Sequence, residues 1–190
     1  MKISNQYEVK RPVDAVWNMF QDVPSVAQCL PGAELTEDKG EGSYAGKVSV
    51  KLGPMSSTFE GQATVTPDSS TKTGHIDGKG ADKAGGSRGQ VNVEYSLAAS
   101  DGGTTVAVEA DITLSGAIAQ FGRTGLVEEM SKRLIDEFVE CLEAKMAAET
   151  PAEAAEIKAD EVKGISLFFS ALGSLIAGFF KKLFKRGDKA

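Results

Sequence analysis

Histidine and cysteine are scarce in this sequence, and their scarcity excludes several kinds of site. The 190 residues include one histidine, His75, and two cysteines, Cys29 and Cys141. No set of ligands stands at the spacing of a zinc site, so we predict no metal centre. Two cysteines so far apart are too few for a disulfide framework, and we expect both to be small core residues. We expect His75 to face outward from a short strand.

Signatures of nucleotide binding and catalysis are also missing. The glycines between Gly78 and Gly89 are not followed by the Gly-Lys-Ser/Thr signature of a phosphate-binding loop. They are too dense for a regular strand throughout, and we expect flexible turns or bulges there. Ser115-Gly116 lacks the strained elbow and the histidine partner of a serine hydrolase. Few titratable groups can converge on a pocket, so the sequence predicts no catalytic residue.

Charge is unevenly distributed along the chain. The formal net charge is −6, but residues 164–190 carry +4, which leaves −10 on residues 1–163. An acidic body argues against nucleic acid as a partner, because such binding uses clustered cations. Residues Met1 to Asn5 do not begin the apolar run of a signal peptide, so we expect the protein to stay in the cytosol.

The pattern of the first 32 residues predicts a strand followed by two short helices. Apolar and polar residues alternate from Lys2 to Val9, which is strand spacing. Pro12 suits the start of a helix, and the apolar residues after it recur at helical intervals. A second helix is predicted from Pro24 to Cys29, where Leu30-Pro31-Gly32 forces a turn.

The middle of the chain predicts an antiparallel sheet. Residues 42–115 alternate between apolar and polar side chains and are interrupted by turn signals such as Gly53-Pro54 and Asp101-Gly102-Gly103. A short strand is expected around Thr73 to Asp77. Each strand is apolar on one face only, so one side of the sheet should face water.

A long helix from about Gly122 to Met146 carries one wide apolar stripe. The expected fold class is therefore α+β: a curved antiparallel sheet of six to seven strands wrapped around a long C-terminal helix, with two short helices near the N-terminus. The apolar face of such a sheet is larger than one helix of about 25 residues can cover. Either the sheet collapses or a cavity remains.

Strand parity and helical periodicity predict the lining of that cavity. The predicted ligand-binding residues are apolar or aromatic: Val48, Val50, Phe59, Val93, Tyr95, Val108, Ile112, Phe121, Leu126, Met130 and Leu134. The predicted pocket mouth contains Leu30, Met55 and Ile118. Such walls suit a flat ring with an isoprenoid tail, oriented by Tyr95 and by the backbone amides near Gly116 to Gln120. Ordinary core packing is the alternative for any one of these residues.

Three segments in consistent order resemble the G-subunit family of carbon monoxide dehydrogenase. They are Asp22-Val23-Pro24 with Leu30-Pro31-Gly32-Ala33-Glu34, Val50-Lys51-Leu52-Gly53-Pro54-Met55 with Phe59-Glu60-Gly61, and Leu114-Ser115-Gly116-Ala117-Ile118-Ala119-Gln120-Phe121-Gly122. The order of elements also resembles the helix-grip, or START-like, superfamily. The resemblance implies a protein without a redox centre that recruits a molybdenum-containing CO dehydrogenase to the membrane. It also implies a pocket linked to quinone, the electron acceptor of that enzyme.

The C-terminal region divides into a linker and an amphipathic segment. Residues 147–163 are rich in Ala and Glu and cannot bury a core, so we expect a linker after a domain of residues 1–146. Residues 164–190 place apolar side chains on one helical face and end in a basic cluster. The predicted membrane-contacting residues are Phe168, Phe169, Leu172, Ile176, Phe179, Phe180, Lys181, Lys182 and Lys185.

This segregation favours a helix lying in the membrane interface, with its basic end against anionic headgroups. Two alternatives remain open. The uncharged run Gly164 to Phe180 is at the lower limit of a transmembrane span. The stripe could instead dock on the enzyme or on another copy of this chain.

Residues and resemblance together predict a non-enzymatic carrier at the cytoplasmic face of the cell membrane. Its ligand is expected to be an isoprenoid quinone, such as menaquinone, with no cofactor held covalently or through a metal. Its expected role is to recruit molybdenum CO dehydrogenase and link it to the quinone pool, with membrane lipid as a further partner. The alternatives are a cyclase or hydroxylase of a hydrophobic substrate on the same fold, or a pure adaptor without a ligand.

Overall fold

The fold is described from a computed structural model of the chain, which describes residues 1–52, 55–123 and 126–159. Nothing is described of the side chains of Leu52, Met55 and residues 121–130. The predicted membrane-contacting segment, residues 164–190, lies outside the described residues. The elements in chain order are β1 (Lys2–Val9), α1 (Val13–Gln21), α2 (Val23–Gln28), β2 (Ala33–Gly40), β3 (Ser43–Leu52), β4 (Met55–Asp68), β5 (Thr73–Asp82), β6 (Ser87–Ser100), β7 (Gly103–Ser115), the 3-10 helix η1 (Ala117–Arg123), α3 (Leu126–Ala147) and α4 (Pro151–Glu156).

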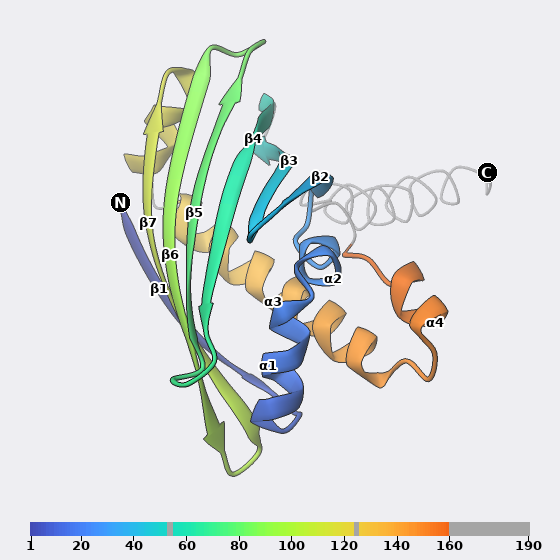
Figure 1. Cartoon of the computed structure of the whole chain (residues 1–190). Coiled ribbons are helices and arrows are strands. Elements are labelled where there is room, and N and C mark those ends of the chain that lie inside the picture. Colours follow the sequence, from blue (N-terminus) through green and yellow to red (C-terminus); the bar gives the residue numbers. More distant parts are fainter. Residues whose placement is uncertain (53–54, 124–125, 160–190) are drawn as a thin grey trace, which may run out of the picture. The chain divides into compact units, whose positions relative to one another are not determined.

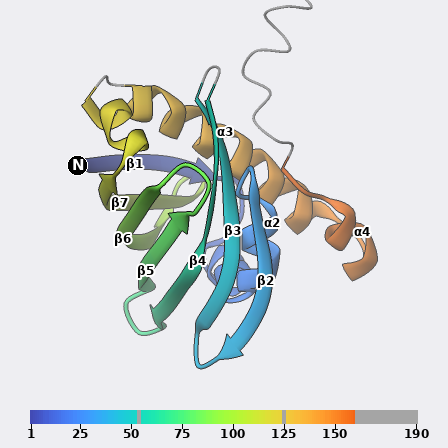
Figure 2. The same ribbon diagram turned by 90° about the horizontal axis from the view of Figure 1, so that it is seen from above.

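The strands form one curved sheet that holds the helices on its inner side (Figure 1). Its seven described strands follow the order β1-β7-β6-β5-β4-β3-β2, and every neighbouring pair is antiparallel. Seen from above, α1, α2 and α3 all lie within the curve of the sheet (Figure 2). The predicted fold class is confirmed, because the sheet wraps around a long C-terminal helix.

Two parts of the sheet differ from the sequence prediction. The glycine-rich stretch is a regular strand on both sides of one turn: β5 runs on to Asp82 and β6 begins at Ser87. The expected turn is present at Gly85 and Gly86, but the prediction was wrong for Gly78, Gly80 and Gly89, which keep their places in the hydrogen-bonded ladder between β5 and β6. The strand β2 was not predicted either. It is a polar edge strand without a clear alternation of apolar residues.

Four glycines stand side by side across the middle of the sheet, and we call them the glycine row: Gly46, Gly61, Gly80 and Gly89. Each is the register partner of the next, from β3 to β6. A Cβ atom on Gly61 would lie 2.0 Å from the carbonyl oxygen of Lys79. One on Gly46 would lie 2.7 Å from the carbonyl oxygen of Glu34. At these two positions the neighbouring backbone occupies the space of a side chain, so only glycine fits.

Two apolar clusters pack one half of the sheet's inner face against the helices. The first lies under α1 and contains Val9, Val16, Trp17, Tyr95, Leu97 and Val106. The second lies where α2 meets α3 and contains Cys29, Phe138, Cys141 and Leu142. Tyr7 lies edge-on to Phe138, with 6.3 Å between ring centroids, and packs against both clusters. Together they join the helical layer to β1, β6 and β7.

The two cysteines are buried, as predicted, but they also form a disulfide. This bond was not predicted from the sequence. Cys29 ends α2 and Cys141 lies on α3, and their Cα atoms are 5.4 Å apart although 112 residues separate them in sequence. In the chain-entropy model, closing so long a loop stabilises the fold by on the order of 4 kcal/mol.

The residues expected to form a linker are packed on the domain as far as they are described. Thr150 caps α4 through a capping box with Glu153. Beyond this helix, Ile157 and Ala159 pack against the cluster around Cys29. The domain therefore continues past the boundary predicted at residue 146, at least to Ala159. Alanine and glutamate form α4 without a core of their own, because the capping box fixes its start.

The glycine row yields a paired test of the fold. We expect Gly61→Ala to lower the free energy of unfolding by at least about 2 kcal/mol, because its methyl group meets backbone that cannot move aside. Gly102→Ala is the matched control. Its Cβ would have nothing within 4 Å, and we expect a change below about 1 kcal/mol. Urea denaturation measures both, and equal effects would contradict the close approach described here.

Candidate functional site

The inner face of the sheet has a packed half and an open half. Side chains near α1 are buried, whereas those around the glycine row on β3 to β7 keep part of their surface accessible. Val48 on β3 is 43% exposed. The predicted lining residues of this open half are all partly accessible: Val48, Val50, Phe59, Val93 and Ile112. The described residues thus leave an apolar surface that no described side chain fully covers.

Glycine backbone and one aromatic ring form the floor of the open half. The Cβ of Phe59 lies 3.3 Å from the place that a Cβ on Gly80 would take. Its ring atom Cε1 lies 3.9 Å from the corresponding place on Gly89. The ring therefore extends from β4 across β5 toward β6, over backbone that carries no side chains. A flat apolar surface next to an aromatic ring suits a planar apolar ligand.

Charged groups are nearly absent from this face. Strand register places one ionisable acid, Asp82, among the described inner-face side chains of β3 to β7. Its Oδ1 accepts hydrogen bonds from the backbone N–H groups of Ala84 and Gly85, at 3.0 and 2.9 Å. Hydrogen bonds from Gly85 and from the Ser57 hydroxyl hold the pKa of Asp82 below its ordinary value. This carboxylate holds the β5–β6 turn and is not free for chemistry on a ligand.

Two predicted lining residues belong to the packed half. Tyr95 is buried, and its ring fills the space next to Gly74, with Trp17 and Phe20 at centroid distances of 6.5 and 5.3 Å. Burial raises the pKa of the Tyr95 hydroxyl. Val108 packs against the same cluster. Tyr95 is thus part of the core beneath α1 and does not line the open half.

The predicted mouth residues lie in different environments. Leu30 is 46% exposed at the end of α2. Ile118 is buried, and its backbone N–H donates to Ser87 Oγ at 3.3 Å. Ala119 N–H donates to the Gly116 carbonyl oxygen, so two of the amides expected to orient a ligand are already bonded.

The remaining predicted residues add little to the open half. Leu134 is half-buried on α3. The side chains of Met55, Phe121, Leu126 and Met130 lie outside the described residues. Leu30 is therefore the only predicted mouth residue that the described part of the chain places at an exposed edge.

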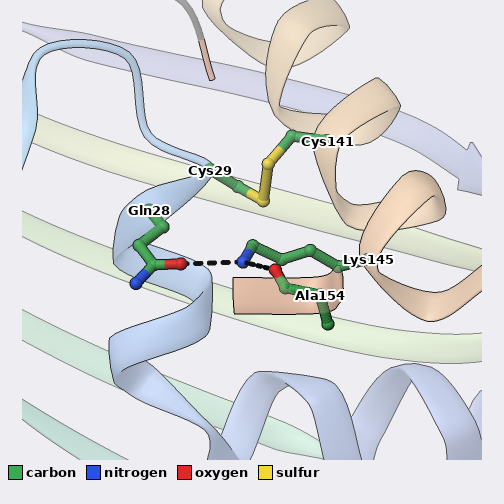
Figure 3. Close-up of a disulfide and its surroundings, with 5 residues drawn as sticks. All are labelled: Gln28, Cys29, Cys141, Lys145 and Ala154. Atoms are coloured by element: carbon green, nitrogen blue, oxygen red, sulfur yellow. Dashed lines mark hydrogen bonds between the residues drawn. A yellow bond between two sulfur atoms is a disulfide. The ribbon is translucent and has the colours of Figure 1, made fainter. Parts of the chain in front are cut away.

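A clamp beside the disulfide was not predicted from the sequence (Figure 3). Lys145 on α3 is only 5% exposed, and its Nζ donates to Gln28 Oε1 at 2.8 Å and to the Ala154 carbonyl oxygen at 2.6 Å. Burial lowers the pKa of this amine. The helical spacing could have indicated this burial. Lys145 lies four residues after Cys141 and three after Leu142, so it shares a helix face with these two buried residues. Disulfide and clamp together fix α2 and α4 to α3.

The outer face of the sheet is polar. It carries two open hollows, of about 650 and 580 Å³. The larger is lined by Lys39, Lys79 and Arg88 among others, and the smaller by Asp68, Glu94 and Glu109 among others. His75 lies at the smaller hollow and pairs with Asp77 at 2.9 Å, which confirms that it faces outward. The larger hollow is lined by polar and charged side chains together with backbone of the glycine row, and it has no large apolar side chain among its lining residues.

Two further searches cover only the described part of the chain. Residues 1–52, 55–123 and 126–159 contain no group of three His, Cys, Asp or Glu side chains placed to hold a metal ion. None of the helices described in these ranges is both long enough and apolar enough to span a membrane.

Comparison with known families gives one match. Residues 6–147 match the model of the carbon monoxide dehydrogenase G-subunit family, CoxG. The match covers most of the chain, because it begins within β1 and continues to the end of α3. No match is found among curated proteins.

Solved structures share the fold at low sequence identity. A conserved protein from Geobacillus kaustophilus has a TM-score of 0.67 and 20% identity over 77% of this chain and 95% of its own. A protein from Thermus thermophilus has a TM-score of 0.58 and 12% identity over 79% and 100%. The Zhui aromatase/cyclase from a Streptomyces species has a TM-score of 0.56 and 19% identity over 78% and 96%. Likeness at these identities shows the fold alone.

Proposed function

The chain belongs to the CoxG family of carbon monoxide dehydrogenase, and from this premise we propose that it is a carrier of an isoprenoid quinone. The ligand binds on the open half of the inner face. Its ring lies against Phe59 and the glycine row, and its tail runs along the apolar side chains of β3 to β7. The family and its fold support the broader assignment, a domain that binds a hydrophobic ligand.

One observation carries this proposal: the open half of the inner face is apolar, partly exposed and nearly free of charge. A soluble domain normally buries such a surface, because exposed apolar area costs roughly 25 cal/mol per Å². An apolar ligand that covers it recovers this free energy. The glycine row adds room, since four adjacent strands carry no side chains there.

Binding is better supported than catalysis on the same fold. An aromatase/cyclase is among the structural neighbours, but at 19% identity it carries only the fold to this chain. Acid–base catalysis needs a titratable group within reach of the substrate. On the described inner face of β3 to β7 the single acid, Asp82, is engaged in a turn. We therefore propose a carrier that releases its ligand chemically unchanged.

The C-terminal region supplies the second part of the proposal. Residues 164–190 carry a net charge of +4, and their apolar stripe suits the interface of an anionic membrane. The family name supports an association with CO dehydrogenase. We propose that the chain holds this molybdenum enzyme at the cytoplasmic face of the membrane and connects it to the quinone pool.

Filling the open half tests where the ligand binds. We expect Gly89→Phe to weaken binding of menaquinone at least tenfold, because the new ring takes the space above the glycine row. A Cβ at this position meets Leu114 Cδ2 at 3.5 Å and Phe59 Cε1 at 3.9 Å, which are ordinary contacts, so the backbone there has room to carry a side chain. Titration with menaquinone in detergent measures the dissociation constant, and circular dichroism checks the fold.

Gln90→Phe is the matched control for this substitution. It adds the same ring one residue further along β6, on the outer face, and should bind menaquinone as the wild type does. Unchanged affinity in a folded Gly89→Phe protein would exclude the open half as the site.

Charge placed on the tail tests membrane recruitment. We expect the triple variant Phe168→Asp, Leu172→Asp, Ile176→Asp to abolish sedimentation of added molybdenum CO dehydrogenase with anionic vesicles. Carboxylates on the apolar stripe cannot enter the interface at a tolerable desolvation cost. The matched control, Ser166→Asp, Ser170→Asp, Ser174→Asp, adds the same charge to the opposite face and should retain most of the recruitment. Equal loss in both variants would mean that the stripe is not the contacting face.

A further inference from the structure

Two exposed apolar side chains, Leu30 and Val48, belong to segments whose backbones are bonded to each other, and we call them the apolar rim. They are 46% and 43% exposed. Among the large hydrophobic side chains of the described residues, only Met1 shares this degree of exposure. Single exposed apolar residues are common, but two on neighbouring bonded segments, next to an open apolar surface, suggest a contact surface.

Backbone contacts hold the two segments of the rim against each other. The carbonyl oxygen of Gly32, two residues after Leu30, accepts a hydrogen bond of 2.8 Å from the N–H of Ser49. Ala33 is the register partner of Val48 on the neighbouring strand. Gly32 has φ +77°, and a Cβ there would lie 2.3 Å from the carbonyl oxygen of Ser49, so the loop after α2 lies directly against β3.

The last described residue of the chain is bonded close to this rim. The N–H of Ala159, the last described residue, donates to the carbonyl oxygen of Gln28 at 2.9 Å. Gln28 stands two residues before Leu30 in the chain. Residues 160–164 can span at most about 18 Å before the amphipathic segment begins. The segment proposed to enter the membrane therefore begins within reach of the rim.

The acidic side chains of the β2–β3 hairpin are paired near the rim or lie away from it, which favours contact with an anionic lipid surface. Near Val48, Lys47 pairs with Glu34 at 2.9 Å, so that acid is neutralised. Three other acids of this hairpin, Glu37, Asp38 and Glu41, lie toward its other end, opposite Ala45 or beyond it. The nearest of them, Glu37, is the register partner of Ala45, which lies three residues, or roughly 10 Å, along the strand from Val48. Contact through the rim would keep these carboxylates away from anionic headgroups.

We propose that the apolar rim is a second membrane-contacting site, which enters the interface of an anionic bilayer beside the tail. This inference rests on the proposed tethering by the tail. A tail alone would leave the domain free to rotate, whereas two neighbouring contacts fix its orientation. The open half of the inner face, which begins at Val48, then faces the bilayer. A quinone can pass between lipid and protein without exposing its isoprenoid tail to water.

A fluorescent label tests this orientation in the full-length chain. Val48→Cys is labelled with the environment-sensitive dye NBD; the native cysteines form a disulfide and do not compete for the reagent. On vesicles of phosphatidylglycerol and phosphatidylcholine, we expect a blue shift and protection of the dye from an aqueous quencher. Asn92→Cys, exposed on the outer face of β6, is the matched control and should show neither change.

Each outcome decides between the possible occupants of the rim. Labelled protein that binds vesicles while the dye at position 48 stays in water would refute the rim contact and leave tethering intact. Failure of the full chain to bind vesicles would overturn both. A blue shift without vesicles would identify another occupant: a second copy if it grows with protein concentration, or the chain's own tail if it does not. In either case the lipid assignment would be wrong.

Substitution at the rim provides a second readout. We expect Leu30→Asp with Val48→Asp to weaken binding of the full chain to the same vesicles by about tenfold, since two apolar contacts are replaced by charge. Thr113→Asp with Asn92→Asp adds the same charge to the outer face and should have a small effect. Equal weakening in both pairs would indicate general repulsion by anionic lipid and contradict a specific contact.

Discussion

Neighbouring backbones approach so closely along the glycine row that Gly46 and Gly61 have no room for a Cβ atom. The row crosses four adjacent strands in register, at the centre of the curved sheet. The same missing side chains leave room on the inner face, which the ring of Phe59 partly fills among the described residues. Curvature and an apolar binding surface thus follow from one constraint, which explains how a small domain with one long helix can hold a ligand.

The interactions of the packed half stabilise the domain, so the open half of the inner face can keep part of its surface accessible. The two apolar clusters join the helices to the sheet, and the Cys29–Cys141 disulfide and the Lys145 clamp join α2 and α4 to α3. These interactions stabilise the fold, so the open half does not need a packed core of its own. The chain leaves the described domain at Ala159, bonded to the end of α2 beside the open edge.

The sequence predicted those features that depend on local periodicity. Alternation identified most strands, the apolar stripe identified α3, and parity placed Val48, Val50 and Phe59 on the inner face. It misjudged the glycines of β5, because their role depends on neighbours in other strands. Tyr95 has the right parity, but its burial depends on how α1 crosses the sheet. The disulfide joins residues 112 positions apart, a proximity that no local pattern reveals.

The central claim is that the domain itself carries a quinone. The most direct test is to purify the full chain from membranes of its own host, extract it with organic solvent and identify the bound molecules by mass spectrometry. A second preparation carries the charged tail substitutions, so that adhering lipid can be separated from bound ligand. The account predicts a near-stoichiometric isoprenoid quinone in both preparations. Quinone that disappears with membrane attachment, or is absent from both, would contradict it.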